Sequence, residues 1–75
     1  MNLQRMVFDG RFKLLYYPTI DMWRLYDLQN DPLEMNDLAA DEDYAPRLQR
    51  MQRLLIRAMK TADDPLSLPV PAAPD

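Results

Sequence analysis

The residues that could do chemistry in this 75-residue chain are chiefly carboxylates. They are densest in one acidic stretch that contains Asp31, Glu34, Asp37, Asp41, Glu42 and Asp43. Hard cations such as Ca²⁺ take oxygen ligands, so this stretch is a candidate calcium loop. Its spacing lacks the alternating Asp pattern and the Gly of a calcium-binding loop. Turn formation and helix capping explain the same carboxylates, and we expect no metal site.

The usual residues of nucleophilic catalysis are missing. The sequence contains no cysteine and no histidine, which removes the thiolate nucleophile, the commonest metal ligand and the usual general base near neutral pH. A disulfide framework and a thiolate metal site are excluded for the same reason. We therefore predict no catalytic residue in this chain.

The cations are concentrated on one segment. Residues 46 to 60 carry a net charge of +5, whereas residues 31 to 45 carry −6. Such a segment could contact phosphates, and neighbouring aromatic strands could stack bases. The whole chain is acidic, with a net charge of −3, and it lacks the basic-Gly-aromatic pattern of RNA-binding sheets. We interpret the cations as a solvated helix face and expect no nucleic-acid partner.

The first half of the chain predicts a three-stranded antiparallel meander. Asp9-Gly10 favours a two-residue hairpin turn with positive φ between strands at about 3–8 and 11–17. The loop Pro18 to Asp21 then leads to a third strand at about 22–28. Apolar residues alternate on both faces of these strands, so one face needs a helix and the other needs a different cover.

The second half predicts one amphipathic helix at about 43–61. Apolar residues fall on one stripe: Tyr44, Leu48, Met51, Leu55, Ala58 and Met59. Cations gather on the opposite side: Arg47, Arg50, Arg53, Arg57 and Lys60. The fold class is therefore α+β, with one domain over residues 1–62 and the helix packed on a face of the sheet. A Pro-rich tail follows over residues 63–75, which we expect to be extended or disordered.

Neither a membrane span nor a signal peptide is visible, because the sequence has no run of about 20 apolar residues and no basic-then-apolar leader. We expect no membrane partner. The compartment stays open between periplasm and cytoplasm.

Three motifs in order resemble the end of a sulfatase. They are R-M-V-F-D-G-R-F-K-L-L-Y-Y, then W-R-L-Y-D-L-Q-N-D-P-L-E-M-N-D-L-A-A-D, then the amphipathic helix, and together they cover residues 5 to about 60. The chain departs from the family pattern at Asp37, where Asn is more usual, and this affects a side-chain hydrogen bond in the loop. The resemblance implies a C-terminal subdomain with a sheet of about four strands, one of them upstream of Asn2.

The catalytic domain of such an enzyme is absent from these residues. The resemblance implies a formylglycine, made from Cys or Ser in a C/S-x-P-x-R motif, and a calcium ion, both expected only in that missing domain. Ser67 has the Ser-x-Pro spacing but Pro71 stands where Arg is required, so Ser67 belongs to the Pro-rich tail. The parent protein is expected to be a sulfatase, while this 75-residue chain is expected to be no enzyme.

Four residues are candidates for bordering a substrate cleft of the parent: Arg11, Lys13, Trp23 and Tyr26. Cations near a sulfate ester would help to bind it, but exposed cations and packed aromatic residues are also ordinary in strands.

Two functions remain open for the chain. The first is a structural subdomain that packs on the catalytic domain of a sulfatase. The alternative is an independent interaction module that binds a partner through its exposed sheet face. We also expect the isolated chain to form homo-oligomers through that face, which we expect to include Trp23 and Leu25.

Overall fold

The first hairpin forms at the predicted place, although its turn differs in detail. The computed structural model describes residues 4–64, in which β1 (Arg5–Phe8) pairs antiparallel with β2 (Phe12–Tyr17). The Asp9 amide donates to the Phe12 carbonyl (3.1 Å), so the central turn residues are Gly10 and Arg11. Gly10 has a φ of 105°, a conformation that favours glycine. Asp9 does not adopt a positive φ; its Oδ1 accepts from the amides of Arg11 and Phe12 instead.

The third strand completes the meander. β3 (Met22–Asp27) pairs antiparallel with β2, and the sheet order is β1-β2-β3. The connecting loop, residues 18–21, is closed by the Ile20 amide, which donates to the Tyr17 carbonyl at 3.3 Å. Asp21 has a positive φ of 49° and accepts a 2.7 Å hydrogen bond from the Tyr16 hydroxyl. The sheet therefore presents β1 and β3 at its two edges.

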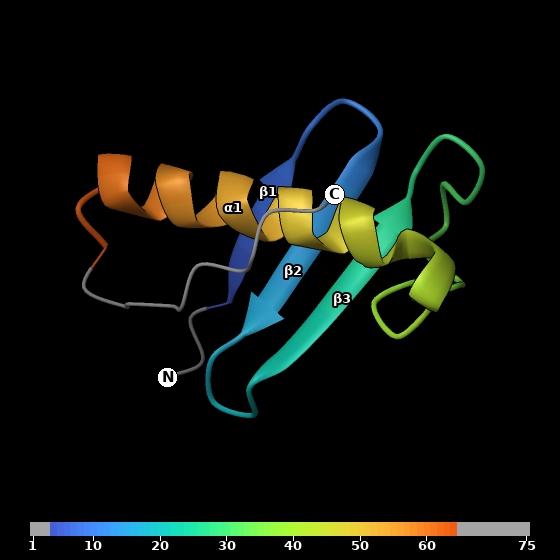
Figure 1. Ribbon diagram of the computed structural model, residues 1–75, viewed down its shortest axis with the longest axis horizontal. Coiled ribbons are helices and arrows are strands. Elements are labelled where there is room, and N and C mark those ends of the chain that lie inside the picture. The colour runs from blue at the N-terminus through green and yellow to red at the C-terminus, as the bar shows by residue number, and fades with distance from the viewer. Residues whose placement is uncertain (1–3, 65–75) are drawn as a thin grey trace.

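The helix covers one face of this sheet (Figure 1). α1 (Ala45–Thr61) follows a single 3₁₀ turn, η1 (Glu42–Tyr44). The Asp41 carboxylate accepts from the Asp43 amide and so caps η1, and a proline lies in the first turn of α1. The predicted apolar stripe is correct at Met51, Leu55 and Met59, which are buried.

Two helix positions depart from that stripe. Ala58 is exposed, whereas Ile56, which the stripe omitted, is buried. A methyl group at position 58 adds little to the apolar face, and the longer Ile56 side chain reaches it from the flank.

The register assigns the two faces of the sheet. The helix face carries Val7, Phe12, Leu14, Tyr16, Trp23, Leu25 and Asp27. The open face carries Met6, Phe8, Lys13, Leu15, Tyr17, Met22, Arg24 and Tyr26. The prediction that Trp23 and Leu25 belong to the uncovered face is wrong: Leu25 is fully buried in the core and Trp23 packs against it. Strand alternation gives two sets of residues but does not say which set the helix covers.

A long loop closes the outer edge of β3. The Leu38 amide donates to the Leu25 carbonyl at 2.7 Å, and the Leu25 amide donates to the Asp37 carboxylate at 2.9 Å. Leu38 is itself buried and joins the core. The loop therefore satisfies backbone groups that an edge strand would otherwise expose.

The α+β fold class is confirmed by three antiparallel strands and one helix. Of the Pro-rich tail predicted over residues 63–75, residues 65–75 lie outside the described residues. Asp63 and Asp64 follow closely after α1, and the Asp64 carboxylate pairs with Arg5. Between residues 4 and 64, no helix has both the length and the apolar character that crossing a bilayer requires.

Candidate functional site

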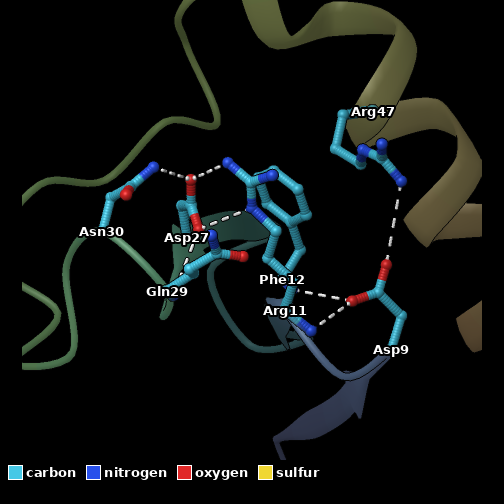
Figure 2. A network of polar contacts seen from close by, with 7 residues as sticks. All are labelled: Asp9, Arg11, Phe12, Asp27, Gln29, Asn30 and Arg47. Carbon is cyan, nitrogen blue, oxygen red and sulfur yellow. Dashed lines mark hydrogen bonds and ion pairs between the residues drawn. The ribbon is translucent and has the colours of Figure 1, made fainter.

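The buried carboxylate of Asp27 accepts four hydrogen bonds from three residues (Figure 2). The Arg11 guanidinium binds it with two parallel hydrogen bonds, Nε to Oδ1 at 3.0 Å and Nη2 to Oδ2 at 2.8 Å. The backbone amide of Gln29 donates to the same carboxylate at 3.2 Å, and the side-chain amide of Asn30 donates to it at 3.0 Å. The carboxylate joins the first hairpin turn to the end of β3.

These contacts change the acidity of Asp27. The hydrogen bonds from Arg11 favour the charged carboxylate more than burial opposes it, and they lower the pKa of Asp27 from 3.8 to about 2. Asp27 is therefore an ionised structural anchor at neutral pH. It is not a general acid, which would require a raised pKa.

A second link joins this hairpin to the helix. Arg47 lies 3.8 Å from the Asp9 carboxylate and its guanidinium stacks 4.7 Å from the centre of the Phe12 ring (Figure 2). Arg11 lies near the same ring at 5.1 Å. Burial raises the pKa of Asp9, but the amides of Arg11 and Phe12 and the charge of Arg47 bring it below its usual value. Cation–π contact and ion pairing thus fix the helix start against the turn.

The two candidate cations for a substrate sulfate already have carboxylate partners. Arg11 binds Asp27 as described above, and Lys13 Nζ lies 3.0 Å from the Glu34 carboxylate. A sulfate would have to compete with those carboxylates in the isolated chain. The role of Arg11 and Lys13 in substrate binding stays a prediction.

The two candidate aromatic residues lie on different faces. Trp23 stacks on Tyr16 on the helix face, with ring centres 4.3 Å apart. Tyr26 is opposite Lys13 on the open face and accepts a 3.5 Å hydrogen bond from Arg24. The structure therefore brings Lys13 and Tyr26 together but separates them from Trp23. A role of Trp23 or Tyr26 in substrate binding also stays a prediction.

The open face contains a shallow hollow of about 250 Å³. Its lining combines apolar residues with one cation and one carboxylate: Leu15, Tyr17, Ile20, Met22, Arg24, Tyr26 and Glu34. Of these, the sequence singles out Tyr26 as a candidate for the substrate cleft and Glu34 only as part of the acidic stretch. Met22, Arg24 and Tyr26 occupy alternate positions along β3, and this spacing could have identified Met22 and Arg24. Glu34 comes from the loop after β3, where it pairs with Lys13, and no local sequence signal places it at the hollow.

The acidic stretch does not form a metal site. Within residues 4–64, no group of at least three Asp, Glu, His or Cys side chains is placed to hold a metal ion. Asp31 instead accepts from the amides of Met35 and Asn36, and Asp37 accepts from the amides of Leu25 and Ala39 through one oxygen. These carboxylate oxygens act as acceptors for loop backbone amides.

Comparison with known proteins assigns the family. Residues 2–61 match the family described as N-sulphoglucosamine sulphohydrolase, C-terminal. The chain therefore belongs to this family of sulfatase C-terminal regions, which confirms the resemblance seen in the sequence.

Two relatives agree with that assignment, and both are far longer than this chain. An N-acetylglucosamine-6-O-sulfatase of Bacteroides thetaiotaomicron is 37% identical over 54 residues, which cover 71% of this chain and 10% of the relative. A crystal structure of a candidate sulfatase from the same species superposes with a TM-score of 0.85 and 33% identity, covering 99% of this chain and 16% of that one. The chain thus spans about a tenth to a sixth of the proteins it resembles.

Proposed function

We propose that this chain is the non-catalytic C-terminal structural subdomain of a sulfatase-like sulfuric ester hydrolase. The observation that supports the proposal is the match of residues 2–61 to a family of sulfatase C-terminal regions. The matched relatives have most of their length outside this region. We assign the catalytic domain of the parent protein to a segment that corresponds to this remaining length, and we expect the chain to pack on that domain.

The open face is the surface that we assign to this packing. Met6, Phe8 and Met22 lie on it and expose 54%, 50% and 39% of their surface, and Ile20 beside them exposes 61%. Isolated exposed apolar residues are ordinary, but a group of them on one sheet face beside a hollow is typical of an interface. The other face is already covered by α1.

The chemistry of the reaction is assigned to the catalytic domain. A formylglycine and a calcium ion would act there, since this sequence has no cysteine or histidine and the acidic groups between residues 4 and 64 do not assemble a metal site. The contribution of the chain is to pack on the catalytic domain through the open face. Lys13 and Tyr26, which lie on the open face, are candidates for bordering the substrate cleft.

The proposal is tested on the coding sequence and then on the protein. A C/S-x-P-x-R motif encoded in frame upstream of Met1 is expected. The encoded catalytic domain, expressed separately, should bind this chain in a pull-down, and Phe8→Asp with Met22→Asp should abolish the complex. Met35→Asp is the matched control, because Met35 is 81% exposed in the loop and not on the sheet. A stop codon directly before Met1 and no complex would favour the independent interaction module.

A further inference from the structure

A second surface, on the opposite side of the molecule, is strongly cationic. The cationic strip consists of Arg50, Arg53, Arg57 and Lys60 on α1, which contains no acidic residue. Arg50 and Arg57 are seven residues apart, as are Arg53 and Lys60, so each pair is separated by about two helical turns, or roughly 10 Å. The strip thus lines up four cations along one side of the helix.

Three of these cations are not neutralised by the described protein. Arg50, Arg57 and Lys60 are exposed, and none of them forms an ion pair within residues 4–64. The cations elsewhere behave differently, since Arg11 and Lys13 each bind a carboxylate. Three exposed cations without an ion pair among the described residues, in an otherwise acidic chain, favour an external anion as their partner.

The surface along the strip is hollowed. One shallow groove of about 280 Å³ is lined by Arg50, Arg53 and Arg57 together with Asp9, Arg47, Met51 and Leu54. A second, of about 310 Å³, is lined by Arg53, Ile56, Arg57 and Lys60. Arg53 and Arg57 line both grooves, so the two form one extended track. Such a track suits a chain molecule better than a single small ion.

The strip remains accessible when the open face is covered. α1 lies on the far side of the sheet from that face (Figure 1), and the strip lies on the side of α1 away from the buried residues Met51, Leu55 and Met59. Packing on a catalytic domain through the open face therefore leaves the strip at the surface of the assembly.

We propose that the cationic strip binds a sulfated polysaccharide. The guanidinium fork of Arg matches the paired oxygens of a sulfate as it does those of a phosphate, and the length of the track accommodates several sugar units. The choice of a sulfated ligand rests on the proposed function. Nucleic acid is disfavoured because the residues that line the two grooves include no aromatic side chain on which bases could stack.

The test uses the full 75-residue chain and size-defined heparin oligosaccharides carrying a fluorescent label. Anisotropy measured at several salt concentrations should show saturable binding whose affinity falls with salt, and unsulfated heparosan of equal length should not bind. The triple variant Arg50→Gln, Arg57→Gln and Lys60→Gln should bind about tenfold more weakly or worse, and its salt slope should fall by roughly one for each lost cation. Glutamine keeps helix propensity close to that of Arg and Lys.

The control variant carries Gln4→Glu, Leu33→Glu and Ala40→Glu at exposed positions outside α1. It lowers the net charge by the same amount as the triple variant. A comparison of the two variants therefore separates the effect of losing the strip cations from the effect of a lower net charge. Circular dichroism must show native helix content in both. The Arg50→Lys, Arg57→Lys variant keeps the charges but loses the guanidinium forks, so it should bind more tightly than the triple variant and more weakly than the wild type.

Three results would overturn the proposal. The control variant could lose as much heparin affinity as the triple variant, heparosan could bind as tightly as heparin, or a single-stranded DNA oligonucleotide could bind more tightly than heparin. If the proposed packing on a catalytic domain is wrong, the result is different: no complex forms with the catalytic domain, while heparin binding persists.

Discussion

Asp27 shows how one residue of a short motif organises this subdomain. In the L-Y-D-L segment, Asp27 follows two buried residues and would be costly to bury as an unpaired charge. Arg11, Gln29 and Asn30 compensate that cost with direct hydrogen bonds. The sequence predicts Arg11 as the first residue of the second strand and offers no indication of this pairing, because the pairing depends on the register of β2 with β3.

The substitution Asp27→Asn should lower the free energy of unfolding by about 2 kcal/mol at pH 7, because the single amide oxygen cannot accept from both Arg11 nitrogens and the negative charge that strengthens these hydrogen bonds is lost. Urea denaturation measures the change. Asp63→Asn is the control, since Asp63 is exposed and its positive φ of 56° suits Asn. An equal loss in both variants would contradict the role of the Asp27 pair.

The same pair predicts a pH dependence with a defined sign. The pKa of Asp27 is lowered from 3.8 to about 2 in the folded state, so its stabilisation is present above about pH 4 and is lost as the pH falls toward 2. The amount is about 1–2 kcal/mol, because Arg11 is 45% exposed and solvent screens the pair. The stability difference between wild type and Asp27→Asn should therefore shrink between pH 4 and 2. A difference that stays constant over that interval would show that Asp27 is not the titrating group.

The departure of Asp37 from the family pattern is explained by the atom that it uses. One oxygen, Oδ1, accepts from the amides of Leu25 and Ala39 at 2.9 and 3.0 Å, and an Asn side chain supplies the same acceptor. Asp37→Asn should therefore change the stability by less than about 0.5 kcal/mol, whereas Asp37→Ala should cost about 1–2 kcal/mol. Thermal unfolding of both variants distinguishes them. Equal losses would indicate that the charge, and not the hydrogen bonds, matters at this position.

At the scale of elements, local patterns predict the strands and the helix but not their contacts. The three strands are predicted from runs of alternating residues separated by the turns at Gly10 and Pro18. The helix α1 is predicted from apolar residues that recur with the period of a helix. Which sheet face receives α1 depends on long-range packing, so Trp23 and Leu25 were assigned to the wrong face. The loop at residues 37–38 that closes the β3 edge is equally long-range.

The contact between α1 and the sheet should dominate the stability. Leu55 is 2% exposed within the core cluster, and Leu55→Ala should cost about 2–5 kcal/mol, because it removes apolar contact and leaves a cavity. Met35→Ala, at a residue that is 81% exposed, should cost almost nothing. Urea midpoints of both variants provide the measurement. A small loss for Leu55→Ala would show that the helix is only loosely attached to the sheet.

At the scale of the whole molecule, the proposal predicts that this chain does not turn over sulfate esters. The sequence has no cysteine or histidine, and residues 4–64 hold no candidate metal cluster. A purified sample incubated with an aryl sulfate, with and without calcium, should release no product above the blank. A mock purification from cells without the gene controls for host sulfatases. Turnover that follows the protein through purification would contradict the proposal.

The open face is less bare than strand alternation predicts. Leu15 and Tyr26 are on it but are only 5% and 7% exposed, because neighbouring side chains and the loop containing Glu34 cover them. The apolar exposure that remains lies toward the rim, at Met6, Phe8 and Met22. A docking surface of this kind depends on the rim residues more than on the centre.

That exposure predicts self-association when no catalytic domain is present. Another copy is the nearest apolar surface for the rim residues, and β1 as an edge strand offers backbone groups for pairing. Light scattering across a dilution series at micromolar concentrations should show a mass that rises with concentration. Phe8→Asp with Met22→Asp should restore the monomer, whereas Leu33→Asp, at a loop residue that is 79% exposed, should not. A wild-type chain that stays folded and monomeric throughout the series would contradict the docking face and favour the independent interaction module.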